Sequence, residues 1–375
     1  MAGLYLHIPF CKQKCHYCDF HFSVSRRQLP EMIQAMKREL VLRKDEMTET
    51  IETIYWGGGT PSLLDERAFA ELFETIYKHY KVGAEPEITL EANPDDLDSS
   101  KLQLLRDLSV NRLSIGIQSF HDDELQMMNR VHTAKEAEYA VLRAQDAGFQ
   151  NITIDLIYGM PQSNASKWEY NVEKFLQLQI PHISSYALTV ESKTALEHLI
   201  KVGKIAAVEE QLAFQQFHTL RNMMKQNGFD HYELSNYALP GFQSRHNVSY
   251  WQETPYMGIG PSAHSFHGTT RSWNVSNNAQ YIKHLDNGEL ALDYEQLSAQ
   301  ERYNEYLMTG LRTKWGVDTR KIESNFGKEC KIYFEKGALK YLNNQQLLYI
   351  NNYEIVVNPE FYFSIDGIIA DLFWV

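Results

Sequence analysis

The sequence is poor in cysteine, with four among 375 residues, and it has no long apolar run. No stretch approaches the roughly 18 consecutive apolar residues that indicate a membrane-spanning helix. The N-terminus also lacks a basic segment followed by an apolar core, which argues against a signal peptide. Thiolates that stay reduced fit a reducing compartment. We therefore expect a cytoplasmic protein with no integral membrane segment.

Basic residues are in the minority, with 36 Lys and Arg against 48 Asp and Glu and a formal net charge of −12. A general nucleic-acid binder normally has a basic face, so this balance argues against nucleic acid as a partner. Apolar residues at 43% and charged residues at 22% describe an ordinary globular protein. The length allows one large domain with an appendage, or two to three ordinary domains.

Three of the four cysteines, Cys11, Cys15 and Cys18, stand within eight positions in the segment YLHIPFCKQKCHYCDF. Thiolates are soft ligands that suit zinc, copper(I) or iron–sulfur clusters. Three thiolates on a [4Fe–4S] cluster would leave one iron open to bind a small molecule. A structural zinc site needs four ligands, so zinc would require one of the neighbouring histidines: His7, His16 or His21. The residues alone leave both alternatives open.

Strand and helix patterns alternate six times along the first 228 residues. Alternation of this kind predicts a parallel sheet with helices outside it, and ligands bind at the C-terminal ends of such strands. We therefore predict an α/β fold, whose sheet is either open or curled into a barrel. The expected strands are residues 4–9, 53–56, 87–93, 112–120, 152–161 and 182–191.

Several polar or glycine-rich positions fall at or just before the predicted strand ends. GGGTP at 57–61 could bring its backbone close to a ligand, or it could be a tight turn only. Glu91 could meet an ammonium group or ribose, or it could be a structural carboxylate. Asp155 lies within an apolar strand, where an unpaired carboxylate costs several kcal/mol, so a partner or ligand must offset that cost. Together with Gln118 and the cysteines, these residues can converge on one binding site at the C-terminal ends of the strands.

The amino-acid composition and the strand–helix pattern change after Gly228. We divide the chain into a core at 1–228, an aromatic-rich connecting segment of short strands and loops at 229–290, and a small unit at 291–375. The last unit has the element order of a winged helix and is mostly helical. Its nearly equal numbers of basic and acidic residues argue against DNA binding. In the connecting segment, HNVSYW places His246 among aromatic residues. Imidazole is a natural haem-iron ligand, although a packed core histidine is the commoner reading.

The segments YLHIPFCKQKCHYCDF, IYWGGGTPS, LEANP, LSIGIQSF, NRVH, IDLIYGMPQ and HNVSYW together resemble the radical S-adenosylmethionine (SAM) superfamily. The resemblance implies that the α/β sheet is a partial (β/α)6 barrel. It also implies a [4Fe–4S] cluster on the three cysteines, with SAM chelating the open iron. In that superfamily, an electron from the cluster splits a sulfur–carbon bond of SAM to release a deoxyadenosyl radical. The present chain is thus expected to be able to cleave SAM.

Across nearly its full length, the chain resembles the HemW family of haem chaperones, which are close kin of the oxygen-independent coproporphyrinogen III oxidases. The resemblance implies residues that bind SAM: Tyr5, Tyr17, Gly58, Gly59, Thr60 and Glu91. It further implies positions for a second SAM or a substrate: Gln118, Arg130 and Asp155. His246, in the HNxxYW pattern of the chaperones, is implicated in haem binding.

Two departures separate this chain from the oxidases. Their cysteine motif continues to a fourth cysteine where this sequence has Phe20, and they carry a long extension before the cluster strand. We therefore expect a haem chaperone that delivers haem to an acceptor protein. The alternative is an oxidase that decarboxylates porphyrinogen propionates. Kinship also implies an electron donor such as flavodoxin or ferredoxin, and it allows a homodimer.

Overall fold

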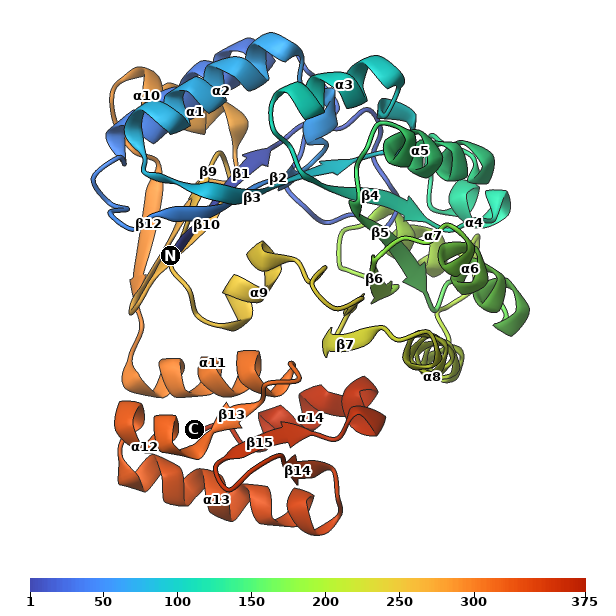
Figure 1. Ribbon diagram of the computed structural model, residues 1–375, viewed down its shortest axis with the longest axis vertical. Helices are drawn as coiled ribbons and strands as arrows, with labels where there is room; N and C mark the ends of the chain where they lie inside the picture. The colour runs from blue at the N-terminus through green and yellow to red at the C-terminus, as the bar shows by residue number, and fades with distance from the viewer.

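The computed structural model describes residues 1–375, and a single twelve-stranded sheet organises most of them. Its centre is a run of six parallel strands that pair in chain order (Figure 1). The pairing does not return from the sixth strand to the first, so the α/β sheet is a partial barrel, as predicted. These strands are β1 (Ala2–Ile8), β2 (Ile51–Gly58), β3 (Val82–Ala92), β4 (Arg112–Gln118), β5 (Asn151–Tyr158) and β6 (His182–Ala187).

Helices cover the outer face of this sheet, while its other face curves around an interior (Figure 1). Side-chain caps fix several helix starts, because Asp65 accepts a hydrogen bond from the backbone N–H of Ala68 and Thr133 forms a capping box with Glu136. The helices are α1 (Leu29–Leu42), α2 (Glu66–His79), α3 (Ser99–Asp107), α4 (Asp122–Met127), α5 (Ala134–Asp146), α6 (Ala165–Gln177), α7 (Ala195–Lys201) and α8 (Glu210–Gln226), with short 3-10 turns η1 (Pro61–Leu63) and η2 (Pro94–Asp96).

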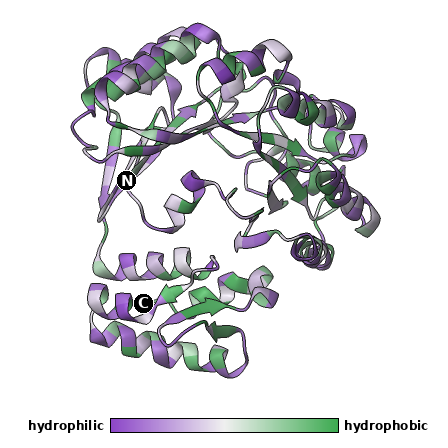
Figure 2. Cartoon of the chain, in the orientation of Figure 1, coloured by the Kyte–Doolittle hydropathy of each residue, from purple (hydrophilic) through white to green (hydrophobic).

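Side-chain alternation along each strand gives the sheet one apolar and one polar face. In β4, Leu113, Ile115 and Ile117 are fully buried in the hydrophobic core, whereas Arg112 and Ser114 face the other way and line the interior. Figure 2 shows hydrophobic residues concentrated along the strands and hydrophilic residues on the outward turns of the helices. The core therefore lies between sheet and helices, and the interior of the partial barrel is polar.

Residues after 228 extend both edges of the sheet. On one edge β8 (Asn236–Ala238) pairs with β6, and β7 (Asp230–Glu233) pairs with β8. On the other edge β9 (Tyr256–Ile259) pairs in parallel with β1. Further strands and a helix follow at that edge: β10 (His264–His267), β11 (Thr270–Asn274), α10 (Asn278–Asp286) and β12 (Leu292–Gln296).

One element of this segment differs from expectation. The sequence pattern predicts only short strands and loops at 229–275, but Arg245–Trp251 form a helix, α9, which lies on the inner side of the sheet (Figure 1). Ser244 starts it, because its side chain accepts a hydrogen bond from the backbone N–H of Asn247. The HNVSYW pattern thus lies on a helix, where side chains three or four residues apart share a face.

The C-terminal residues form a smaller unit in which helices pack beside a three-stranded sheet of order β13–β15–β14. Helices followed by a β-hairpin make it winged-helix-like, as expected. The domain boundaries at 228 and 290 remain predictions. Strand β12 lies after the second boundary but still pairs with β11, which lies before it. The elements are α11 (Ala299–Leu311), β13 (Val317–Asp318), α12 (Thr319–Phe326), α13 (Lys328–Asn343), β14 (Leu347–Tyr349), β15 (Glu354–Val357), η3 (Pro359–Ser364) and α14 (Ile365–Ala370).

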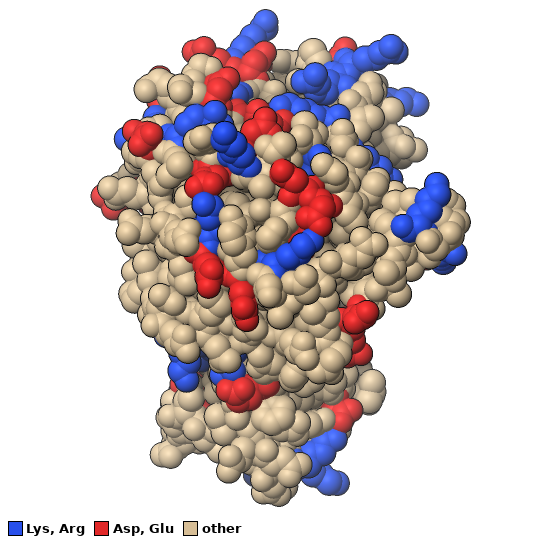
Figure 3. Space-filling view, turned by 90° about the vertical axis from the view of Figure 1, so that its right-hand side faces the viewer, with Lys and Arg blue, Asp and Glu red and all other residues tan.

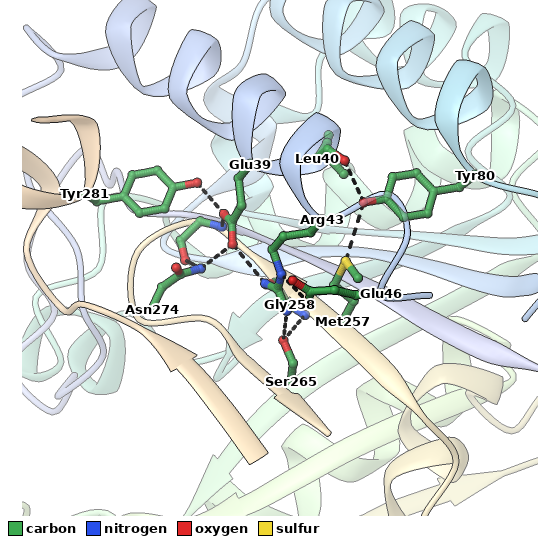
Figure 4. A network of polar contacts seen from close by, with 11 residues as sticks. Glu39, Leu40, Arg43, Glu46, Tyr80, Met257, Gly258, Ser265, Asn274 and Tyr281 are labelled. Carbon is green, nitrogen blue, oxygen red and sulfur yellow. Dashed lines mark hydrogen bonds and ion pairs between the residues drawn. The ribbon is translucent and has the colours of Figure 1, made fainter. Parts of the chain in front are cut away.

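A buried ionic network ties α1 to the added strands (Figure 4). Glu39 and Arg43 form an ion pair of 2.9 Å and are at most 1% exposed. Asn274 donates to Glu39 over 2.7 Å, and Arg43 donates to the carbonyl oxygen of Gly258 over 2.9 Å. Every charge of this network meets a partner, so we interpret it as structural.

The surface adds two observations. Basic and acidic side chains are interspersed on the face seen in Figure 3, with large areas that carry neither. Among the helices, none combines the length and the apolar character that crossing a membrane requires.

Candidate functional site

A pocket of about 440 Å³ extends from the cysteine loop along the polar inner face of the sheet. The pocket runs along strands β2 to β6 and includes residues at their C-terminal ends, where ligands bind in folds of this kind. Most of the sequence-predicted site residues line it: Cys11, Cys15, Tyr17, Cys18, Gly58, Gly59, Thr60, Glu91, Gln118, Arg130 and Asp155. Tyr5 and His246 do not line it.

The cysteine loop is held in place by contacts to the turns beyond neighbouring strands. Lys12, between the first two cysteines, forms an ion pair of 2.7 Å with Asp95 in η2. The backbone carbonyl of Met127 accepts a hydrogen bond from Nδ1 of His16 over 2.8 Å. Gln13 donates to the carbonyl oxygen of Asn129 over 2.9 Å. These contacts fix the loop at the C-terminal end of the sheet.

The histidines that would complete a zinc site have structural partners instead. His7 Nε2 lies 2.9 Å from the carbonyl oxygen of His21, and His21 Nε2 lies 2.8 Å from Oδ1 of Asn278. The structure contains no group of three or more His, Cys, Asp or Glu side chains that converges on a single ion. On a [4Fe–4S] cluster each thiolate binds its own iron, so that convergence is not needed. The three-cysteine donor set therefore fits a cluster.

Burial and mutual proximity affect the thiols themselves. Burial raises the pKa of Cys11 and of Cys18 to about 11. Nη1 of Arg130 donates to Sγ of Cys15 over 3.4 Å. A cation such as iron is needed to hold buried thiols as thiolates at neutral pH. The loop thus offers three sulfur ligands and one neighbouring positive charge.

The glycine run lies directly against the strand that delivers the cysteines. A Cβ atom on Gly59 would stand 2.6 Å from the carbonyl oxygen of Phe10, so only glycine fits there. Gly58 has a φ of 104° and its N–H donates to Glu91 over 3.2 Å. Thr60 N–H donates to the same Phe10 oxygen over 2.7 Å. The glycine run therefore forms a tight turn, and this is compatible with its backbone also approaching a ligand.

Glu91 is the central carboxylate of the outer pocket. Tyr55 donates its hydroxyl to Glu91 Oε1 over 2.9 Å. Burial, with a contribution from the negative charge of Asp155, raises the pKa of Glu91 to about 7. No basic side chain forms an ion pair with it. A ligand that carries a positive charge or donates hydrogen bonds would stabilise its ionised form.

The second predicted set occupies the middle of the pocket. Gln118 ends β4 with a φ of 70°, which is an unusual backbone conformation for a residue other than glycine. Arg130 donates to Asn93 Oδ1 and to the carbonyl oxygen of Gly116, both over 2.7 Å. Burial raises the pKa of Asp155 to about 6, and the Ser114 hydroxyl donates to it over 3.3 Å. These side chains lie close enough to contact one bound molecule.

Tyr5 and His246 lie behind the pocket, with their rings 6.5 Å apart between centroids. His246 is 1% exposed, and its two ring nitrogens lie 2.7 Å from Thr53 Oγ1 and 2.8 Å from the Tyr250 hydroxyl. Burial lowers its pKa to about 3, so the ring is neutral. In this structure neither nitrogen is free to bind iron. The haem-binding role of His246 stays a prediction, and it requires these contacts to break.

Sequence reasoning missed the inner half of the pocket. The missed residues are polar side chains of the strands, one residue of α9 and the residue that caps it: Tyr55, Thr89, Arg112, Ser114, Thr153, Ser184, Tyr186, Asn247 and Ser244. A usable signal existed in β4, where Arg112, Ser114, Gly116 and Gln118 alternate with apolar residues in RLSIGIQ. For Asn247 there was no such signal, because short strands and loops, and not a helix, were expected in this segment.

Comparisons with known proteins agree with this geometry. Residues 5–175 match the family described as Radical SAM superfamily, and residues 297–360 match the HemN C-terminal domain. The heme chaperone HemW of Bacillus subtilis is 33% identical over 94% of this chain and 96% of its own length. The heme chaperone HemW of Lactococcus lactis is 36% identical over 92% of this chain and 90% of its own length.

The chain belongs to the HemW family of radical SAM proteins.

Membership in this family implies a [4Fe–4S] cluster and SAM as cofactors. Among solved structures, coproporphyrinogen III oxidase (HemN) from Escherichia coli superposes with a TM-score of 0.86. The match covers 99% of this chain and 90% of that chain at 22% sequence identity. At this identity the likeness shows a shared fold and not a shared reaction. The radical SAM fold with its C-terminal unit is therefore common to both proteins.

Proposed function

We propose that this protein is a haem chaperone that holds a [4Fe–4S] cluster and SAM, binds haem and transfers it to an acceptor protein. The observation that carries the proposal is the convergence of three cysteines, a glycine turn and Glu91 on one pocket. The similarity to heme chaperones over nearly the whole chain supports the haem part. An electron donor such as flavodoxin or ferredoxin would act on the cysteine-loop side.

Cys11, Cys15 and Cys18 would hold the cluster, which when bound would supply an electron for cleaving SAM. Arg130 lies against Cys15 and would keep a positive charge beside its sulfur. The backbone around Gly58 and Thr60, with Tyr17, would surround the methionine part of SAM at the pocket mouth. Gly59 would keep this backbone close to the cysteine strand.

Glu91 would accept the positive or hydrogen-donating groups of SAM. Its hydrogen bonds from Tyr55 and the Gly58 N–H fix the orientation of the carboxylate before a ligand arrives. Its pKa of about 7 means that it loses its proton near neutral pH. A cationic ligand would bind the ionised form, so SAM affinity should increase as pH rises through 7. Asp155 and Gln118 would contact a second SAM or a substrate deeper in the pocket.

The test begins with anaerobic reconstitution of the full-length protein with iron and sulfide. The expected result is a cluster signal in electron paramagnetic resonance, together with haem binding seen by absorption. Haem loaded on the protein should then pass to an apo-haem protein, which serves as a surrogate acceptor. Failure of the reconstituted protein to bind haem would reject the chaperone proposal.

The same preparation tests the oxidase alternative. Incubation with reductant, SAM and coproporphyrinogen III should yield no vinyl product. Phe20, 68% exposed on the rim of the pocket, stands where the resemblance places the fourth cysteine of the oxidases. Formation of vinyl product would show that this difference does not prevent decarboxylation, and the enzyme interpretation would replace the chaperone interpretation.

A further inference from the structure

The inner end of the pocket contains a buried positive charge without a negative partner. Arg112 at the start of β4 is 2% exposed and lines the pocket. Its hydrogen bonds go to the Asn151 side chain, to Thr153 Oγ1 over 2.5 Å and to the carbonyl oxygen of Phe242 over 3.3 Å. None of these acceptors carries a charge. A buried guanidinium normally pairs with an anion, because burying an isolated charge is costly.

A neighbouring hydroxyl has no partner at all. Thr89 on β3 stands directly opposite Arg112 in the parallel ladder, and both side chains line the pocket. Thr89 is 1% exposed and its Oγ1 has no hydrogen-bond partner. Unpaired buried hydroxyls are uncommon in native proteins, since each costs about 1–3 kcal/mol. A ligand atom between Thr89 and Arg112 would satisfy both.

The helix α9 supplies a third group. Ser244 and Asn247, three residues apart, face the pocket, whereas His246 faces Thr53 of β2 and also contacts Tyr250, four residues further on. The backbone N–H of Asn247 bonds to Ser244, but its carboxamide makes no hydrogen bond within the protein. Glu87 accepts the backbone N–H groups of both Arg245 and His246 over 3.0 Å and so fixes this orientation.

We infer that Arg112, Thr89 and Asn247 form a subsite for a carboxylate at the inner end of the pocket. Guanidinium, hydroxyl and carboxamide N–H groups are the donors that a carboxylate accepts. The inference rests on the proposed function, in which two ligands could bring a carboxylate to the inner pocket: a second SAM through its methionine part, and haem through its propionates.

Charged groups around the subsite limit which carboxylate fits. Asp155 lies two residues beyond Thr153 on β5, lines the same pocket, and would repel a bare anion when ionised. A ligand that also carries an ammonium group would place it toward Asp155 and its carboxylate toward Arg112. The Ser114 and Ser184 hydroxyls, also on the pocket wall, can orient either group.

Three variants of the cluster-loaded, full-length protein test the subsite. Thr89→Val keeps the shape and removes a hydroxyl that makes no bond in the protein, so its melting temperature should equal or exceed that of the wild type. Asn247→Ala removes the free carboxamide. Each should weaken ligand binding about three- to tenfold, the effect of one lost hydrogen bond. Arg112→Gln should weaken it about ten- to a hundredfold, because a charged donor is lost.

Binding is measured by anaerobic equilibrium dialysis with SAM, with haem and with haem dimethyl ester. Weaker SAM binding in the variants identifies the SAM carboxylate as the ligand. Weaker haem binding, with equal binding of the ester by all proteins, identifies a propionate. Arg245→Ala is the matched control on α9, since Arg245 points outward to Glu52 and the Glu85 carbonyl, and it should bind like the wild type.

The inference would be overturned if folded Thr89→Val and Asn247→Ala bound both SAM and haem with wild-type affinity. It would also be overturned if neither the wild type nor any variant bound SAM or haem. A wild type that binds SAM but not haem contradicts the proposed function alone. The SAM comparison between wild type and variants still decides the subsite in that case.

Discussion

Two buried polar regions of this protein differ in how their charges are compensated. In the network of Figure 4, Glu39 and Arg43 pair with each other, and each guanidinium nitrogen and each carboxylate oxygen has at least one protein partner. In the pocket, Arg112 is buried and Glu91 and Asp155 are partly buried, and none of the three forms an ion pair.

The difference separates groups that hold the fold from groups that await a ligand. A paired and fully bonded network is costly to break but offers nothing to a small molecule. Uncompensated groups destabilise the unliganded protein and gain a partner on binding. We therefore expect substitutions in the network to lower stability with little effect on ligands, and substitutions in the pocket to weaken ligand binding without lowering stability.

The largest expected effect is in the pocket, with Cys15→Ala. Loss of one of three ligands should abolish cluster assembly while leaving the melting temperature of cluster-free protein nearly unchanged. Iron content and the paramagnetic resonance signal after reconstitution measure the first, and thermal unfolding measures the second. Cys330→Ala is the matched control, because Cys330 is a buried thiol of α13 outside the pocket. Retention of a full cluster by Cys15→Ala would contradict the site.

In the network, Arg43→Ala should lower the free energy of unfolding by about 3–5 kcal/mol, since it leaves the Glu39 carboxylate buried without its cation. Urea unfolding of cluster-free protein measures this loss. Arg38→Ala, in the same helix, is the control, because the Arg38–Asp286 ion pair is solvent-exposed. A loss no larger in Arg43→Ala than in Arg38→Ala would mean that the network is not structural.

Glu91→Gln sharpens the comparison through its pH dependence. With its pKa raised to about 7 by burial, folded Glu91 keeps a proton that the unfolded chain releases near pH 4.5. The free energy of unfolding of the wild type therefore loses a contribution as pH rises from 4.5 to 7. Glutamine does not titrate, so the variant should gain about 1–3 kcal/mol relative to the wild type across that window. Urea unfolding at several pH values checks this, and a constant difference would contradict the raised pKa.

The smallest expected effect is that of His246→Gln, behind the pocket. Glutamine cannot reach both Thr53 and Tyr250, so the free energy of unfolding should fall by about 1 kcal/mol. The haem absorption spectrum of the same variant tests the sequence-based role. An unchanged spectrum and affinity would remove His246 from the haem site, and a changed spectrum would mean that its buried contacts open on haem binding.

How far the sequence could predict this protein depends on the range of the pattern involved. The six parallel strands and the convergence at their C-terminal ends followed from local alternation, and the structure confirms both. Helix α9 escaped prediction because seven residues are too few to establish a helical period. The burial of His246 also escaped it, since Thr53 lies 193 residues away and only tertiary contacts bring them together.

The pairing of edge strands has a consequence for synthesis on the ribosome. β1 emerges first, yet its second neighbour, β9, ends at Ile259, and β6 gains its second neighbour only when β8 at 236–238 has emerged. Until then the growing sheet exposes two unpaired edges, each able to pair with another chain. Nascent chains that stall before residue 259 should therefore depend on chaperones that shield strand edges, and released fragments of that length should aggregate.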